Sequence, residues 1–377
     1  MSEQIEKVRL DLSGQDHGYE VVIGYGILEK LGELVESSVG GQGKVKAGVV
    51  CDENVVGTWG EKAGEAMRAT GWEVTSGAMK VGEEFKNLET VGMLLDWLLE
   101  EKLERKSPVV AVGGGITGDV TGYVAASLLR GVPFVQCPTT LLAMVDASVG
   151  GKTGVNSKWG KNLIGAFHQP GIVVADTQTL ETLPRRELLC GLAECVKHGV
   201  IRDEALFDWL LAEAESIHRL DKTVMIELVK RNVAIKAKVV MNDEKEAGER
   251  AHLNFGHTFA HALEASTGYN QLKHGEAVSL GMVAAAEFAV ARRLCDGVVL
   301  ERLLAVLEAL GLPVKIGDVE GGAVAMPDID ALVEVMRHDK KVEDGKIRLV
   351  LPTKIGGVVI VDDAEADEIS KAWEIIR

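Results

Sequence analysis

Three histidines that lie close together in the sequence could bind a metal ion. His257 and His261 are four residues apart in the string NFGHTFAHALE, and His274 follows in LKHGEAV. Residues four apart share one face of a helix, which is the spacing of HExxH zinc sites, although the glutamate of that motif is missing here. His274 begins the next expected helix after a turn that contains glycine, so it can approach the other two. The spacing predicts a metal-binding cluster and leaves open which histidines are ligands.

A carboxylate is needed to complete such a site, because catalytic zinc usually has three protein ligands and one open position. Glu194 is the best candidate, since it lies in the otherwise apolar helical stretch GLAECVKHG, where an unpaired buried charge is costly. For each histidine taken alone, the alternative is an ordinary core or capping residue. Three histidines within one short stretch, together with Glu194, favour the metal site.

A glycine-rich turn, GGGITGD at residues 113–119, follows a short apolar run and precedes the small-residue helical stretch TGYVAAS. A strand, a glycine turn and a helix start together favour pyrophosphate, because free N–H groups at the helix start face the anion. The string is not GxGxxG, and a tight turn that only packs a helix onto the sheet is the alternative. Polar residues also follow two other expected strands: Asp52 and Asn54 after one, and Thr139 and Thr140 after the other. They strengthen the prediction of a dinucleotide site.

A lysine-rich glycine loop is expected at residues 146–162, DASVGGKTGVNSKWGKN. Its GGKT resembles the end of a P-loop, but the first glycine of GxxxxGK[ST] would fall at Asp146, which excludes a Walker motif. Lysines on such a loop suit a phosphorylated or carboxylated ligand. A solvated surface loop is the alternative.

Two kinds of secondary structure must position these residues. The first half of the chain alternates β-rich runs with helical stretches, which predicts a parallel sheet covered on both faces, with strands at residues 19–23, 47–51, 109–112, 134–137 and 172–175. The second half is expected to be mainly helical, at 188–201, 223–240, 276–294 and 300–310, with a strand pair at 347–352 and 356–363 and a closing helix at 365–376. The break at Pro184 separates a Rossmann-like domain, residues 1–182, from an α-helical metal- and substrate-binding domain, residues 183–377.

The composition limits the classes of partner. A formal net charge of −16 argues against a nucleic-acid surface, because binding a polyphosphate needs a clustered basic face. No apolar stretch could span a bilayer and the polar N-terminus has no secretion signal, so we expect a soluble, cytoplasmic protein without a membrane partner. The five cysteines are scattered and form no CxxC pair, which predicts reduced, non-catalytic thiols.

Taken together, these strings resemble the 3-dehydroquinate synthase family of sugar-phosphate cyclases over nearly the whole chain. The most specific are GGGITGDVTGYVA, PTTLLAMVDASVGGKTGVNSKWGKNLIGAFHQP, GLAECVKHG, DEKEAGER, NFGHTFAHALE, HGEAV and the late Asp339-Lys340-Lys341. The resemblance implies a homodimer that binds NAD and zinc, with cobalt as a possible substitute. It also implies the shikimate-pathway substrate 3-deoxy-D-arabino-heptulosonate 7-phosphate, a small molecule with a carboxylate and a phosphate.

The same resemblance implies a role for individual residues. It gives the metal ligands as Glu194, His257 and His274, and so makes His261 a substrate contact. The implied NAD contacts are Asp52, Asn54, Glu83, Lys86, Gly114, Gly115, Asp119, Thr139, Thr140, Lys152, Lys161, Thr179 and Thr182. The implied substrate and catalytic residues are Arg130, Asp146, Lys152, Asn162, Lys197, Lys236, Arg250, His261 and one of Lys340 and Lys341.

In the family's mechanism NAD⁺ oxidises the C5 hydroxyl, phosphate is eliminated, the ketone is reduced again, the ring opens, and an aldol step closes the carbocycle. Zinc is the Lewis acid on the hydroxyl that is oxidised. Three alternatives remain: another cyclase such as a 2-epi-5-epi-valiolone or 2-deoxy-scyllo-inosose synthase, a zinc polyol dehydrogenase of the glycerol dehydrogenase type, and a silent regulatory module. Lys236 and Arg250 with DEKEAGER favour the dehydroquinate pattern.

Overall fold

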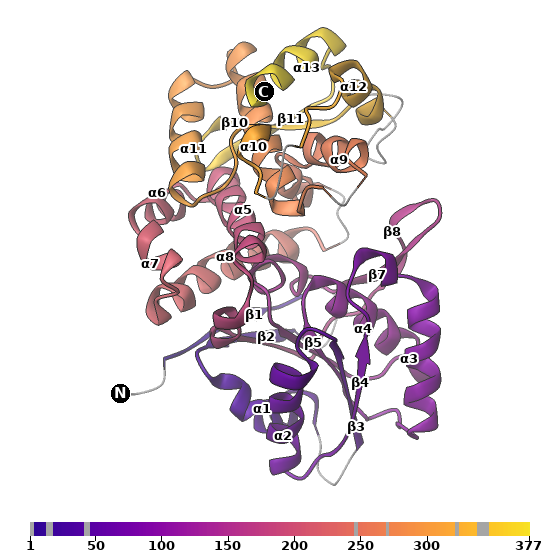
Figure 1. Cartoon of the computed structure of the whole chain (residues 1–377). Coiled ribbons are helices and arrows are strands. Elements are labelled where there is room, and N and C mark those ends of the chain that lie inside the picture. Colours follow the sequence, from indigo (N-terminus) through magenta and orange to yellow (C-terminus); the bar gives the residue numbers. More distant parts are fainter. Residues whose placement is uncertain are drawn as a thin grey trace. The chain divides into compact units, whose positions relative to one another are not determined.

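The computed structural model describes residues 4–12, 18–40, 46–244, 248–268, 271–320, 324–337 and 347–377. The chain forms two compact units (Figure 1). The first comprises Met1–Leu183 and Lys222–Glu244, and the second comprises Pro184–Asp221 and Lys245–Arg377. This division differs from the contiguous one expected from the sequence, because Lys222–Glu244 returns to the first unit.

In the described part of the first unit, seven strands form one sheet in the order β1-β2-β9-β6-β5-β3-β4. Their bounds are β1 Ile5–Leu10, β2 Tyr19–Gly24, β3 Lys46–Asp52, β4 Glu73–Met79, β5 Val109–Gly113, β6 Phe134–Pro138 and β9 Ile172–Asp176. β1 pairs antiparallel with β2, and the other neighbours are parallel. The five expected strands are confirmed. The sequence analysis missed β1 and β4, which are partly exposed edge strands and carry polar residues within their apolar pattern.

Helices cover both faces of this sheet, so its central strands have an apolar core on either side. On one face, Val49, Val110 and Val174 pack with α1 Leu31–Val39 and α2 Glu61–Ala69. On the other, Val50 and Ala111 pack with α3 Leu88–Glu100 and α4 Gly115–Ser127. Burying one such valine contributes about 1.5–3 kcal/mol, which explains why these strands are continuously apolar.

Two further segments complete the first unit. Residues expected to form a lysine-rich loop instead form the antiparallel hairpin of β7 Lys152–Ser157 and β8 Gly160–Phe167. The loop prediction is wrong from residue 152 onward, because Val155 is buried in the core under α3 and α4 and ties the strand to it. Helix α8, Lys222–Asn242, packs on β1 and β2, and its Lys230 Nζ lies 3.0 Å from Glu6 Oε2 of β1.

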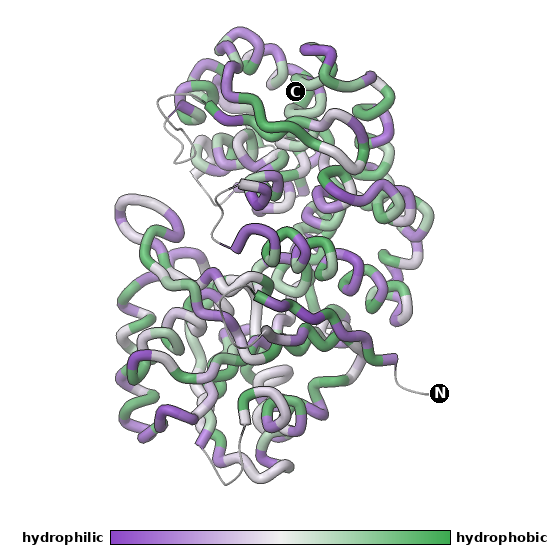
Figure 2. Tube along the Cα trace, turned by 180° about the vertical axis from the view of Figure 1, so that it is seen from behind, coloured by the Kyte–Doolittle hydropathy of each residue, from purple (hydrophilic) through white to green (hydrophobic). Residues whose placement is uncertain are grey.

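The second unit is mainly helical, as expected. Its helices are α5 Arg185–Arg202, α6 Glu204–Ala212, α7 Ala214–His218, α9 His257–Ser266, α10 His274–Ala291, α11 Gly297–Ala309, α12 Ile329–Arg337 and α13 Ala366–Trp373. The expected strand pair is confirmed as β10 Leu349–Lys354 and β11 Gly357–Val361. Helix α10 is buried on nearly all sides by α5, α9, α11, α13 and β10. The surface helices of both units alternate purple and green in Figure 2, as expected for helices that bury one face.

Helices long and apolar enough to cross a membrane are absent from the described residues.

Candidate active-site residues

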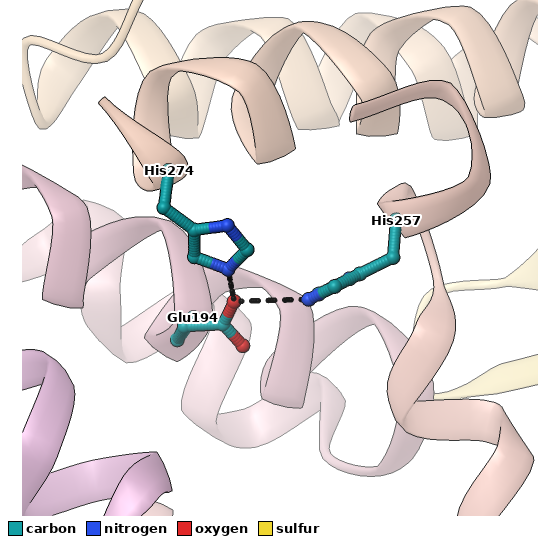
Figure 3. A group of neighbouring side chains, drawn as sticks. All are labelled: Glu194, His257 and His274. Atoms are coloured by element: carbon teal, nitrogen blue, oxygen red, sulfur yellow. Dashed lines mark ion pairs between the residues drawn. The ribbon is translucent and has the colours of Figure 1, made fainter. Parts of the chain in front are cut away.

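Three helices of the second unit bring Glu194, His257 and His274 together (Figure 3). Glu194 lies in the middle of α5, whereas each histidine is the first residue of its helix, α9 or α10. Glu194 Oε1 lies 3.5 Å from His257 Nε2 and 3.6 Å from His274 Nε2. One candidate ligand atom from each residue falls within 4.8 Å of the other two. Two imidazole nitrogens and a carboxylate oxygen at these separations suit a divalent metal such as zinc.

Two glycines allow the helices to approach this closely. Gly256 precedes α9 with a left-handed φ of 77°, and a Cβ there would lie 2.9 Å from the backbone N of Met282 in α10. At Gly275, beside His274, a Cβ would overlap the backbone of Cys190, one turn before Glu194 on α5. Both positions therefore require glycine for the start of each histidine-bearing helix to reach its neighbour.

The groups around Glu194 keep its buried carboxylate ionised. Glu194 and Lys197 are both buried, 1% and 2% exposed, and form an ion pair one helical turn apart. Burial by itself would raise the pKa of Glu194, but the charges of Lys197 and His257 and the contact with His274 hold it well below the usual value. Neither Glu194 oxygen makes a regular hydrogen bond in the described structure. An ionised, buried carboxylate that faces two imidazoles fits a metal ligand.

The second nitrogen of each imidazole has a partner of its own. His257 Nδ1 lies 3.1 Å from the carbonyl oxygen of Phe255, and His274 Nδ1 lies 3.4 Å from Glu264 Oε1. Burial lowers the pKa of His274, but its contacts with Glu194 and Glu264 outweigh this and raise it to about 10. Both rings therefore turn Nε2 towards Glu194.

His261, the other histidine of the spacing argument, lies one turn along α9 from His257. The two ring centroids are 5.9 Å apart, and those of His257 and His274 are 5.3 Å apart. His274 begins α10 after a turn, and the structure places it, together with His257, next to the Glu194 carboxylate.

In the first unit, polar groups gather where the parallel strands β3, β5 and β6 end. Asp52 Oδ2 accepts a hydrogen bond of 3.1 Å from Thr117 Oγ1, and Asp52 Oδ1 accepts one of 3.0 Å from the backbone N–H of Asn54. The N-cap residue of α4 is Gly114, which has no side chain to cap the N–H groups of this helix start. This edge can hold a pyrophosphate at the helix start and a ribose beside Asp52.

The remaining residues expected at this edge have local partners. Thr140 Oγ1 accepts a hydrogen bond of 3.1 Å from Ala143 N, and Thr139 is buried directly after β6. Thr179 and Thr182 lie on the 3₁₀ segment η6, Thr177–Thr182, that follows β9. Thr182 Oγ1 accepts a hydrogen bond of 2.7 Å from Trp59 Nε1, and Thr179 Oγ1 donates one of 2.8 Å to Asp176 O.

A second polar group of the first unit centres on Lys86. Lys86 Nζ lies 2.6 Å from Asp119 Oδ2 and 2.5 Å from Asn162 Oδ1. Burial raises the pKa of Asp119, and the charge of Lys86 opposes this shift. Glu83 Oε1 accepts a hydrogen bond of 2.7 Å from Asn156 Nδ2, a residue that the sequence analysis did not single out. Lys161 lies on β8 next to Asn162.

The expected substrate residues differ in exposure. Lys236 of α8 is buried and pairs with Asp146 Oδ1 at 2.8 Å, whereas Lys152 and Arg130 are exposed. Arg130 has a left-handed φ of 70°, a strained conformation for a residue other than glycine. In the second unit, Arg250 is buried on the 3₁₀ segment η7, Glu249–Asn254. Lys340 and Lys341 lie outside the described residues.

Two residues missed by the sequence analysis have clear structural roles. Glu264 lies against His274. The sequence signal that could have found it is its position seven residues after His257, which places both side chains on the same face of one helix. Asp176 ends β9 and accepts hydrogen bonds from the backbone N–H groups of Gly26, Leu28 and Gln178. The prediction that no cysteine forms a disulfide is confirmed, because all five are free.

Comparisons with known proteins agree with this arrangement. Residues 76–190 match the family described as 3-dehydroquinate synthase N-terminal, and residues 191–342 match 3-dehydroquinate synthase C-terminal. A 3-dehydroquinate synthase from Nostoc sp. is 45% identical over 362 residues, which cover 94% of this chain and 96% of that protein. The chain belongs to the 3-dehydroquinate synthase family. A family member from Caulobacter vibrioides is 44% identical, over 93% of this chain and 94% of its own length.

Solved structures extend the family resemblance to the fold. A 2-epi-5-epi-valiolone synthase from Streptomyces hygroscopicus subsp. jinggangensis, solved with NAD⁺ and Zn²⁺ bound, matches with a TM-score of 0.85 and 28% identity, over 97% of this chain and 98% of that one. A 2-deoxy-scyllo-inosose synthase with NAD⁺ and Co²⁺ matches with a TM-score of 0.86 at 24% identity, over 98% and 99%. A probable glycerol dehydrogenase from Sinorhizobium meliloti has a TM-score of 0.62 at 16% identity, over 93% and 94%, and shares the fold alone.

Proposed function

We propose that this chain converts 3-deoxy-D-arabino-heptulosonate 7-phosphate to 3-dehydroquinate and phosphate, with NAD as a recycled cofactor and a divalent metal, zinc or cobalt. The observation that carries the proposal is the buried carboxylate of Glu194 between the Nε2 atoms of His257 and His274. This cluster lies in a chain that is 45% identical to a 3-dehydroquinate synthase over nearly its whole length. The enzyme is thus a carbon–oxygen lyase that eliminates phosphate and closes a carbocycle.

In this proposal the metal ligands are Glu194, His257 and His274. When bound, a metal at these ligands would supply a Lewis acid for the substrate hydroxyl that is oxidised, and NAD would supply reversible hydride transfer. Lys197 keeps Glu194 ionised, because its charge lowers the pKa of that carboxyl against the effect of burial. At the ends of β3, β5 and β6, Gly114 and Gly115 would hold the pyrophosphate of the dinucleotide and Asp52 a ribose hydroxyl.

The substrate carries a carboxylate and a phosphate, so it needs local cations within a protein of net charge −16. We assign this role to Lys152, Lys197, Lys236, Arg250 and one of Lys340 and Lys341, with Arg130, Asp146, Asn162 and His261 as further contacts. Buried Lys236 and Arg250 suit it because a charge at low solvent exposure interacts more strongly with an anion. We also propose that the enzyme is a cytoplasmic homodimer, by analogy with its family.

The decisive experiment follows phosphate release and NADH absorbance during turnover of the heptulosonate phosphate with catalytic NAD⁺. A 3-dehydroquinate synthase releases stoichiometric phosphate, and no NADH accumulates because the hydride returns to the substrate. Steady accumulation of NADH would instead indicate a polyol dehydrogenase. Cyclisation of sedoheptulose 7-phosphate, with no reaction of the heptulosonate phosphate, would indicate a 2-epi-5-epi-valiolone synthase.

A further inference from the structure

Glu264 is a buried carboxylate beside the metal cluster that has no role in the proposed reaction so far. It lies on α9 and is 7% exposed, and its Oε1 atom is 3.4 Å from His274 Nδ1. Positions 257, 261 and 264 are spaced four and three residues apart, so they form one stripe on α9. The helix that supplies His257 therefore also supplies a carboxylate to the other histidine, which comes from α10.

We propose that Glu264 is a positioning residue for the metal site. Its carboxylate accepts the Nδ1–H of His274, which fixes the tautomer and turns the Nε2 lone pair towards Glu194 and the metal. A neutral imidazole has one donor and one acceptor nitrogen, so a hydrogen bond from Nδ1 leaves Nε2 as the ligand. This inference rests on the metal site of the proposed function.

His257 shows the same arrangement with a different partner. Its Nδ1 lies 3.1 Å from the carbonyl oxygen of Phe255, a neutral backbone group only two residues away. The partner of His274 is a charged side chain from another helix. Only the second arrangement adds a negative charge next to the metal ligands.

That charge matters because Lys197 is buried in ion-pair contact with Glu194. The formal charges of Glu194 and Lys197 cancel, so this pair alone offers a divalent cation little net attraction. Glu264 adds a further negative charge on the far side of the His274 ring, at low solvent exposure where charges are weakly screened. We therefore expect Glu264 to strengthen metal binding through both orientation and charge.

The test measures zinc affinity of the full-length, metal-free protein by competition with a chromophoric chelator. Loss of an outer-shell partner typically weakens metal binding by about 10–100-fold, and we expect this range for Glu264→Ala. Glu264→Gln keeps an acceptor oxygen but loses the charge, so its affinity should lie between those of Glu264→Ala and the unchanged protein. Glu301→Ala, at an exposed position of α11, is the matched control and should bind zinc normally.

His274→Ala separates this inference from the proposed metal site. If His274→Ala binds zinc as well as the unchanged protein does, the metal site of the proposed function is wrong. If His274→Ala weakens binding but Glu264→Ala and Glu264→Gln do not, only the role of Glu264 is overturned. Circular dichroism checks that each variant folds. If Glu264→Ala does not fold, Glu264→Gln is the deciding variant. An unchanged zinc affinity of Glu264→Gln would overturn the proposal, and a weakened zinc affinity would support it.

Discussion

The two candidate cofactor regions are built from different parts of the chain. In the first unit, the edge where we expect the nucleotide is made by strand ends and a helix start, where Gly113 and Gly114 leave room beside the side chains of Asp52 and Thr140. In the second unit, the metal cluster depends on three side chains, which glycines only help to bring together. A phosphate site made of backbone is sensitive to added bulk, whereas a metal site is sensitive to the loss of a donor atom or a charge.

The largest expected effect is at the side-chain site. Glu194→Gln removes the charge of the proposed metal ligand, so we expect turnover to fall by more than about 100-fold, since loss of an outer-shell partner alone costs about 10–100-fold. The protein should remain folded but less stable, because Lys197 stays buried without this carboxylate. Steady-state kinetics measures turnover, metal analysis measures metal content, and circular dichroism checks the fold.

Glu308→Gln makes the same chemical change at an exposed position of α11 and should leave all three measurements unchanged. A Glu194→Gln protein with normal turnover and normal metal content would remove Glu194 from the metal site.

Metal removal tests whether the second unit needs the ion to fold. Incubation with a strong chelator should abolish turnover and leave the circular dichroism spectrum unchanged, because a catalytic site with an open position does not usually hold a core together. Activity should return when zinc or cobalt is added. Full turnover by protein shown to be metal-free would contradict the proposed chemistry.

The expected nucleotide edge of the first unit should be sensitive to a single added methyl group at Gly113. A Cβ at Gly113 would lie 2.6 Å from Thr117 Oγ1 and 2.7 Å from Asp52 Oδ2, so Gly113→Ala must displace the side chain that we expect at the ribose. We expect NAD binding to weaken by about tenfold, or ~1.4 kcal/mol, with zinc affinity unchanged. Isothermal titration with NAD⁺ measures the first effect, and chelator competition measures the second.

Gly92→Ala is the matched control, since a Cβ at this position of α3 meets no atom within 4 Å. Unaltered NAD affinity in Gly113→Ala would argue that the dinucleotide does not use this strand end.

The smallest effect concerns a partly exposed ion pair of the second unit, in contrast to buried Glu194. The hydrogen bond from Arg292 holds the pKa of Glu368 at about 2, below its usual value. A lowered pKa stabilises the fold at pH values above the unfolded-state pKa of about 4.3, and this contribution disappears as pH falls towards 2. Because Glu368 is more than a third exposed, Glu368→Gln should lower the free energy of unfolding by no more than about 1 kcal/mol at pH 6.

Urea denaturation at pH 6 and pH 3 measures this difference. We expect the gap between Glu368→Gln and the unchanged protein to be smaller at pH 3. An equal or larger gap at the lower pH would mean that the charge of Glu368 is not the cause.

How much of this could be predicted from the sequence differs between the two regions. The gathering of polar groups at one edge of the sheet was predictable, because short apolar strands followed by Asp52, glycines or threonines must end at one edge of a parallel sheet. For the metal cluster, helical spacing favoured His257 with His261 and could not choose between His261 and His274. That choice depends on how α10 packs against α5, which requires glycine at position 275.

Other features were outside the reach of sequence patterns. The sequence predicts a loop at residues 146–162, and the lysines and glycines of this segment hide Val155, the buried residue of the hairpin that begins at Lys152. Helical spacing places Glu264 on the same face as His257, but its contact with His274 joins two helices across a turn and cannot be predicted from that spacing. Local patterns thus predict elements and strand ends, whereas contacts between helices depend on packing.

The return of α8 to the first unit has a consequence for how the chain is made. Strands β1 and β2 are synthesised first, but the helix that covers them follows only after α5, α6 and α7 of the second unit. On the ribosome, an apolar face of the new sheet waits uncovered until residues 222–244 emerge, and such surfaces are prone to aggregation. A fragment that stops at Leu183 would keep that face bare, so the first unit should be expressed with α8 attached.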